Sequence, residues 1–98
     1  MKTDERSIEE GKELLLRRAA FGKQCEQFMV SDIGRYLLAR AEDEAAAGFN
    51  EFKRADPRDG KMLEKVQNKI LRAEGFKQWL EDAVVDGLAA FNVLQEGE

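Results

Sequence analysis

Apolar side chains recur along this chain at spacings of three and four residues, the period of an amphipathic helix, without the sustained alternation of a strand. The pattern predicts an all-α protein of three helices, over residues 7–29, 32–55 and 57–95. With 98 residues the chain has the length of one small domain with one modest core. We therefore expect residues 1–98 to form a single helical domain.

The first predicted helix has a start signal in the segment SIEE. The Ser7 hydroxyl is expected to accept the backbone N–H of Glu10 while the Glu10 carboxylate reaches back, which is a capping box. The apolar residues of this helix share one face, as a core-facing helix requires. They include Leu14, Phe21, Cys25 and Phe28. Cys25 is the only cysteine, so it cannot form an internal disulfide, and we expect it to be a small core residue.

Ser31 is expected to cap the second helix, because it stands directly before Asp32 and the apolar repeat that follows. The middle of this helix, AEDEAAAG, has few large side chains and would let a neighbouring helix approach closely. The run Glu42-Asp43-Glu44 contains three carboxylates, but consecutive helical residues point about 100° apart and cannot converge on one metal ion. The run therefore predicts a solvated helix face.

The only proline of the chain marks the predicted start of the third helix. Asp56 is expected to be the N-cap, Pro57 the first helical residue, and Asp59 a first-turn acid favoured by the helix dipole. An ion site at Asp56 and Asp59 is an alternative, but a calcium loop needs several more oxygen ligands. The sequence thus predicts a helix start at this point.

The helical pattern of the third helix continues past two glycines, Gly75 and Gly87, each of which predicts a bend, a break or a close helix contact. An unbroken helix of this length would span roughly 57 Å, against about 36 Å for the second helix. The part of the third helix that extends beyond the second must pack against another segment. We expect an antiparallel hairpin of the second and third helices turned at Asp56, with the first helix packed on its distal end.

Cations recur on the third helix at spacings of three and four, and aromatic residues continue the same stripe. We call these residues the cationic–aromatic stripe: Arg58, Lys61, Lys65, Lys69, Arg72, Phe76 and Trp79. One interpretation needs no ligand: the stripe is solvated early and buried later, where the first helix joins. A second is a protein partner, whose acidic surface meets the cations and whose apolar surface meets Trp79. A third is nucleic acid, with phosphates on the cations and a base on the aromatic.

The overall charge disfavours nucleic acid as the ligand. The formal net charge is −4, and the third helix also carries Glu64, Glu74 and Glu81. No helix-turn-helix or other nucleic-acid motif is present in the sequence. After Lys77 there are five acids and no cation, so the C-terminal end is an acidic pole.

The composition also argues against several classes of protein. Hydrophobic residues make up 43% and charged residues 37%, which is too apolar for disorder and too polar for a membrane protein. No apolar run approaches the roughly 18 residues of a membrane span, and the N-terminus lacks the apolar region of a secretory signal. The chain has no histidine, its one thiol has no evident base, and its hydroxyls lie near predicted caps or the chain start. We expect a cytosolic, non-enzymatic protein with no catalytic residue, metal site or cofactor.

Two segments resemble a group of small, acidic, all-helical proteins encoded by tailed bacteriophages. They are SDIGRYLLARAE (31–42) and DPRDGKMLEKVQNKILRAEGFKQWLEDAVVDG (56–87). The likeness lies in a Gly-Arg-Tyr-Leu box, an Asp-Pro turn, a Gln-Asn to Arg-Ala run and a Trp-Leu pair, and it covers about half of the chain. The resemblance implies a viral origin and transfers no catalytic residue.

The expected function is therefore a bacteriophage interaction protein that acts through helical protein–protein contacts, in virion assembly or DNA packaging. Its expected partner is a protein, either a copy of itself in a homo-oligomer or another phage or host protein. One alternative is a small inhibitor or adaptor that binds a host protein, with the acidic pole mimicking nucleic acid. Another is an accessory DNA-binding packaging subunit. The expected location is the cytoplasm of the infected bacterium or the virion.

Overall fold

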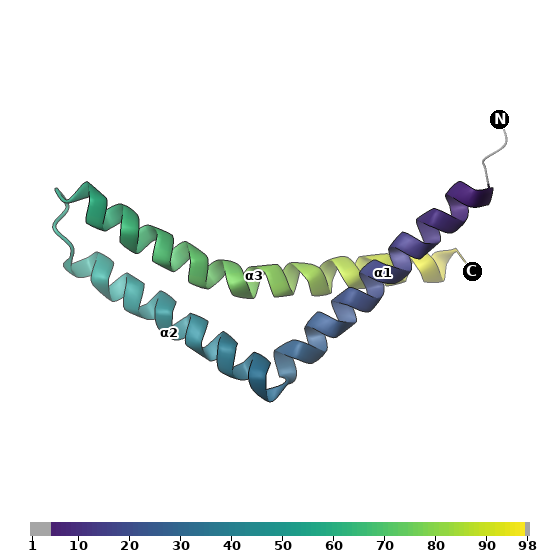
Figure 1. Cartoon of the computed structure of the whole chain (residues 1–98), viewed down its shortest axis with the longest axis horizontal. Helices are drawn as coiled ribbons and strands as arrows, with labels where there is room; N and C mark the ends of the chain where they lie inside the picture. Colours follow the sequence, from purple (N-terminus) through teal and green to yellow (C-terminus); the bar gives the residue numbers. More distant parts are fainter. Residues whose placement is uncertain (1–4, 98) are drawn as a thin grey trace. The chain divides into compact units, whose positions relative to one another are not determined.

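The computed structural model describes residues 5–97, which form three α-helices and contain no strand (Figure 1). The helices are α1, Glu5–Val30; α2, Asp32–Arg54; and α3, Gly60–Glu96. The predicted all-α class with three helices is confirmed. The chain divides into two compact units, and α3 contributes to both. None of these described helices is both long enough and apolar enough to span a bilayer.

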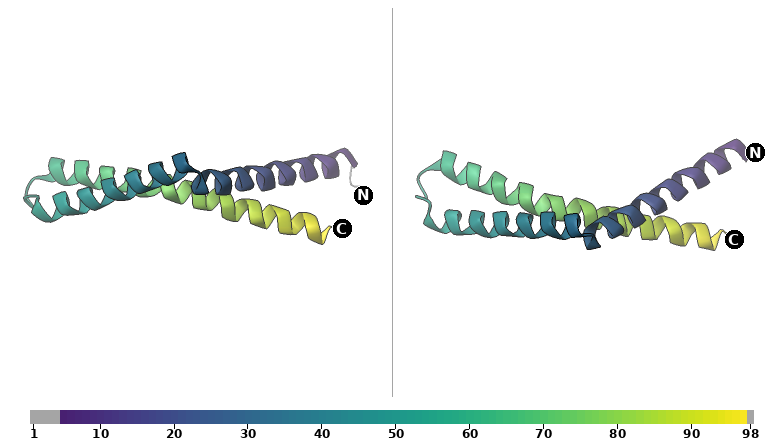
Figure 2. Two further views of the ribbon diagram at one scale, coloured as in Figure 1. Left: turned by 90° about the horizontal axis from the view of Figure 1, so that it is seen from below. Right: turned by 60° about the horizontal axis from the view of Figure 1, so that its bottom comes forward.

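The first unit is a helical hairpin of residues 29–79, in which α2 lies antiparallel beside the first half of α3 (Figures 1 and 2). The two helices approach closely at Gly48, where an added Cβ would lie 2.6 Å from Cγ1 of Ile70. This contact fits the close approach predicted from the small residues of α2. Val66 is 1% exposed and Ala73 is also buried, so the hairpin has a narrow apolar seam.

The turn of the hairpin differs from the prediction. Asp56 does not cap α3: its side chain accepts the backbone N–H of Arg58 at 2.9 Å, and its carbonyl accepts the N–H of Asp59 at 2.9 Å. Pro57 therefore stands inside a turn, where its fixed φ is equally suitable. Asp59 is the capping residue, because its side chain accepts the N–H of Met62 at 3.1 Å and α3 begins at Gly60. Asp56 thus stabilises the turn, and Asp59 caps α3.

The second unit packs residues 5–28 of α1 on residues 80–96 of α3. The helices are in contact at Gly22 and Gly87, both of which are buried. Cys25 and Ala90 are buried in the same unit, so the prediction for Cys25 is confirmed. The pairing of α1 with the end of α3 agrees with the expected packing of the first helix on the distal end.

The predicted helix ends are partly confirmed. Ser31 caps α2, as its hydroxyl accepts the N–H of Gly34 at 3.0 Å. The prediction for Ser7 is wrong, because α1 is already helical at Glu5 and Ser7 lies within it. Glu5 lies in the first described turn of α1, where the helix dipole favours its negative charge. Helix α3 runs unbroken through Gly75 and Gly87.

Candidate protein-interaction surface

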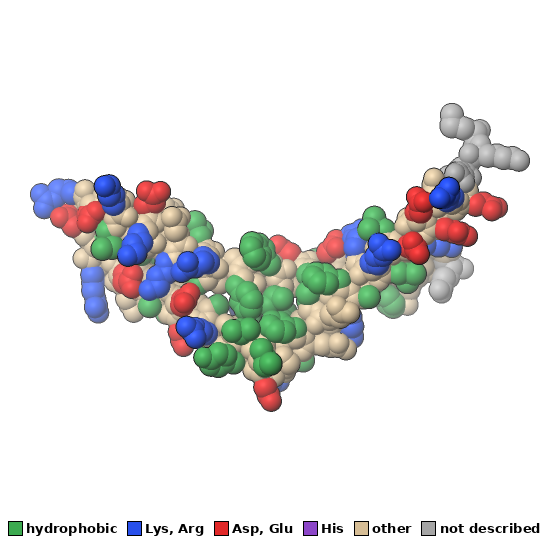
Figure 3. Space-filling model, viewed as in Figure 1, with side chains coloured by type: hydrophobic (Ala, Val, Ile, Leu, Met, Phe, Trp, Pro, Cys, Tyr) green, Lys and Arg blue, Asp and Glu red, His purple; other side chains and the backbone are tan. Residues whose placement is uncertain are grey.

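The most unusual property of the described residues is how few apolar side chains they bury. Only Cys25, Val66, Ala73 and Ala90 are buried hydrophobic residues. Large hydrophobic side chains remain exposed on all three helices, and hydrophobic side chains are visible at the surface in Figure 3. They are Ile8, Leu14, Leu16, Phe21, Val30, Ile33, Tyr36, Leu37, Phe49, Phe52, Met62, Leu71, Trp79, Val85, Leu88, Phe91 and Val93.

The aromatic end of the cationic–aromatic stripe is not buried as one interpretation expected. Trp79 is 77% exposed, more than any other large hydrophobic residue described, and Phe76 is half-buried. The reason lies within the hairpin unit. Helix α2 packs on the face of α3 that carries Val66 and Ala73, and Trp79, the last residue of this unit, points off that face. Burial of the aromatic end therefore does not explain why the stripe changes from cations to aromatic residues.

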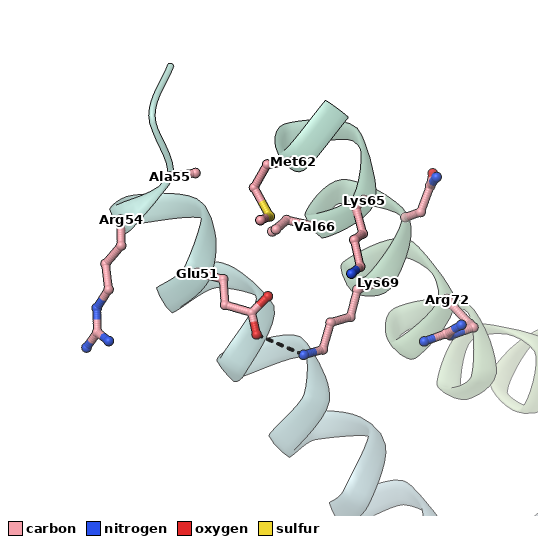
Figure 4. Close-up of a pocket in the computed structure, with 9 residues that line it drawn as sticks. Glu51, Arg54, Ala55, Met62, Lys65, Val66, Lys69 and Arg72 are labelled. Carbon is pink, nitrogen blue, oxygen red and sulfur yellow. Dashed lines mark hydrogen bonds and ion pairs between the residues drawn. The ribbon is translucent and has the colours of Figure 1, made fainter. Parts of the chain in front are cut away.

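Part of the stripe borders an open groove between α2 and α3, with a volume of about 660 Å³ (Figure 4). We call it the cationic groove. It has four cations in its wall against one carboxylate, together with apolar side chains from both helices. Its lining residues are Glu51, Arg54, Ala55, Met62, Lys65, Val66, Asn68, Lys69 and Arg72.

The charges of the cationic groove are not equivalent. Lys69 donates to Glu51 across the hairpin at 3.0 Å, so its charge is already compensated. Arg54 belongs to the wall of the groove, but in Figure 4 its guanidinium points away from α3. Lys65 and Arg72 are exposed, and no salt bridge of theirs is present among the described residues. These two cations give the groove its available positive charge.

The remaining residues of the stripe lie elsewhere. Arg58 forms an ion pair with Asp56 at the turn, at 3.3 Å, and the backbone and side-chain N–H groups of Arg58 lower the pKa of Asp56 below its ordinary value. Lys61 is exposed outside the groove. Phe76 lines a smaller hollow that it shares with Arg72. The structure thus brings together Lys65, Lys69 and Arg72, and separates the two ends of the stripe from them.

Sequence reasoning missed the contribution of α2 to this groove. Glu51 and Arg54 belong to α2 and were not grouped with the stripe. A hairpin turned at Asp56 would place Glu51 opposite Lys61, whereas the structure pairs Glu51 with Lys69, so the sequence carried no signal for this pair. The pair Glu42–Lys77, with 3.9 Å between charged atoms, follows the same register. The register of the two helices in the structure therefore determines that Lys69 is the stripe cation that meets a carboxylate of α2.

A second groove, of about 520 Å³, opens between α2 and α3 and is mostly apolar. Phe49 and Phe52 of α2 line it together with Leu71 of α3, and all three side chains are about half exposed or more. Glu64 is the only charged residue in its wall. The hairpin therefore presents one cationic and one apolar groove.

The described residues contain no group of three or more His, Cys, Asp or Glu side chains placed to hold a metal ion. Comparisons with protein-family models, with curated proteins and with solved structures found no match to this chain.

Proposed function

We propose that this chain is a non-enzymatic interaction protein of a bacteriophage, which acts through helical contacts and assembles with copies of itself in virion assembly or DNA packaging. The observation that carries the proposal is that residues 5–97 expose seventeen large hydrophobic side chains and bury only four hydrophobic residues. The resemblance of residues 31–42 and 56–87 to phage proteins supports the viral setting.

The energetics of the two units favour assembly. Removing a side chain such as Leu or Phe from water contributes about 1.5–3 kcal/mol, and here most of these side chains stay in water. Pairs of helices with so small an apolar seam are stabilised mainly by packing against something further. A partner that covers even a few of the exposed side chains would therefore add substantially to the stability of the fold.

The proposal is tested by the mass of the purified protein in solution. Sedimentation equilibrium should give a multiple of 11.1 kDa at micromolar concentration. Trp79 is the only tryptophan, so its fluorescence reports one position, and its emission should shift to the blue as the protein assembles. Trp79→Lys should weaken the assembly, whereas Arg35→Glu, on exposed α2 surface, serves as a control. A mass of 11.1 kDa at every concentration, with no change in Trp79 emission, would contradict assembly.

A host-directed inhibitor is the second candidate function, and the acidic end of α3 favours it. From Leu80 onward the chain has no Lys or Arg, so this segment could imitate the charge of a nucleic acid. A protein of this kind would be monomeric and would compete with DNA for a DNA-binding protein. The same mass measurement therefore separates the two functions.

A further inference from the structure

The cationic groove combines positive charge with an apolar floor. Lys65 and Arg72 supply exposed cations, while Met62 is 45% exposed and Val66 closes the base of the groove. The flanking sequence adds to the positive potential, because residues 53–72 contain seven cations and three acids. Such a groove is suited to a ligand that is acidic at its edges and apolar at its centre.

The last turns of α3 have these properties. Val85 is 66% exposed and Leu88 is 56% exposed, and they lie three residues apart on one side of the helix. Asp82 stands one turn before Val85, and Glu96 stands eleven residues after it, which is about three turns and so the same side. The segment from Leu80 carries no cation. It is an amphipathic helix face with acids around an apolar centre.

From this complementarity we propose that the cationic groove binds the acidic C-terminal segment of α3 from a second copy of this chain. The inference rests on the proposed function and names its contact. Helix α3 carries Lys65 and Arg72 of the groove on its first half and the acidic segment on its last turns, so every copy has both surfaces.

Two features favour a helix of a second copy over nucleic acid. The exposed Met62 side chain and the partly exposed Ala55 suit Val85 and Leu88, and aliphatic groups gain nothing from a phosphate. Glu51 also stands in the wall, where its carboxylate repels a phosphate backbone. The net charge of −4 further opposes non-specific attraction of DNA.

The contact is tested by charge reversal in the full chain. The groove variant is Lys65→Glu with Arg72→Glu, and the segment variant is Asp82→Lys with Glu96→Lys. Each should weaken self-association roughly tenfold or more in Kd, because attraction at the contact becomes repulsion. Arg35→Glu and Asp43→Lys are the matched controls, as both residues are exposed outside the groove and the segment. Circular dichroism confirms that every variant remains helical.

Mixing supplies the decisive measurement. The groove variant and the segment variant, each weakened alone, should associate when combined, because the reversed groove of one now fits the reversed segment of the other. Recovery to within about threefold of the original Kd is expected. If the protein assembles but both variants keep the original Kd, this contact is wrong and the proposed assembly stands. If the unaltered protein is monomeric throughout, both fail, and retention on DNA that the groove variant abolishes would assign the groove to nucleic acid.

Discussion

Gly22 of α1 and Gly87 of α3 meet backbone to backbone, so that a Cβ built on either residue would lie 2.8 Å from the Cα of the other. Real Cβ atoms do not come this close to backbone atoms, so a side chain at either position would push the two helices apart. The contact also sets the neighbouring ion pair, because Arg18 lies one turn before Gly22 and Asp86 stands next to Gly87. Arg18 donates through Nε to Asp86 at 2.9 Å and through its terminal nitrogen to the other carboxylate oxygen.

Gly22→Ala should destabilise the unit of α1 and the end of α3. The new methyl group would lie 2.8 Å from the carbonyl oxygen of Ala83 as well as from Gly87, so the helices must separate. Overpacking costs about 1–3 kcal/mol, and a clash with backbone atoms that cannot rotate away lies at the upper end of that range, above the gain of about 1 kcal/mol in helix propensity. Thermal unfolding followed at 222 nm, at one protein concentration, measures the change. An unchanged or higher Tm would show that the helices are not in this contact.

Gly75→Ala should have the opposite effect. Beyond the nearby backbone of its own helix, nothing lies within 4 Å of a Cβ built on Gly75, and the residue is in the interior of helix α3. The substitution removes the conformational freedom of glycine without a clash and should stabilise the protein by about 0.5–1 kcal/mol. Denaturant unfolding at fixed concentration gives the value. A loss of stability would indicate that α3 bends or opens at Gly75 and is not continuous there.

The two interior glycines of α3, Gly75 and Gly87, show how far the sequence determines the fold. The apolar repeat was sufficient to predict three helices, their order and the hairpin, because that pattern depends on residues close in sequence. The apolar repeat did not distinguish the surroundings of Gly75 from those of Gly87. Only the position of α1 distinguishes them, since Gly87 has Gly22 against it and Gly75 has open space. Contacts between distant segments lie outside what local periodicity can predict.

Asp59→Ala should destabilise α3 by about 1 kcal/mol, because Asp59 caps the helix through the N–H of Met62. Asp56→Ala removes only an exposed turn contact with Arg58 and should cost about 0.5 kcal/mol or less. The sequence had assigned the cap to Asp56, so the order of the two effects tests that correction. Urea unfolding of both variants in parallel gives the comparison. A larger loss from Asp56→Ala would restore the original assignment.

The candidate site was predictable only where it lies on one helix. The spacing of Lys65, Lys69 and Arg72 placed them on one stripe of α3, and the structure keeps them together. Exposure of Trp79 could not be read from the same spacing, because a stripe shows which residues share a face and not what covers it. The helix that packs against the stripe determines which of its residues are covered, and the position of that helix depends on contacts between segments distant in sequence.

Asp86 should make the stability of the protein depend on pH in the acid range. The hydrogen bonds from Arg18 lower the pKa of Asp86 below its ordinary value, and the same bonds with the attraction of the carboxylate raise the pKa of Arg18. A depressed folded pKa means that the stabilisation is fully present above the unfolded pKa of about 3.9 and is lost as the pH falls through the lower folded value.

Asp86→Asn removes this dependence and should lower Tm at pH 7 while flattening the fall of Tm between about pH 4 and pH 2. Thermal melts across that range, with Asp43→Asn as the control at an exposed acid, measure both effects. An unchanged acid slope in Asp86→Asn would show that the pair with Arg18 does not form in solution.

Glu51→Gln should tighten self-association without changing the fold much. Glu51 supplies the single carboxylate of the cationic groove and holds Lys69 at 3.0 Å, and both side chains are partly exposed, so loss of the pair should cost under about 1 kcal/mol. The neutral, isosteric side chain leaves the charge of Lys69 for the acidic segment of a second copy, and Kd should fall by about two- to fivefold.

Glu42→Gln is the matched control, because Glu42 pairs with Lys77 in the same hairpin and lies outside the groove. Sedimentation equilibrium at low salt compares the two. Weaker association of Glu51→Gln, with Glu42→Gln unchanged, would mean that the groove receives a cationic surface and not an acidic one.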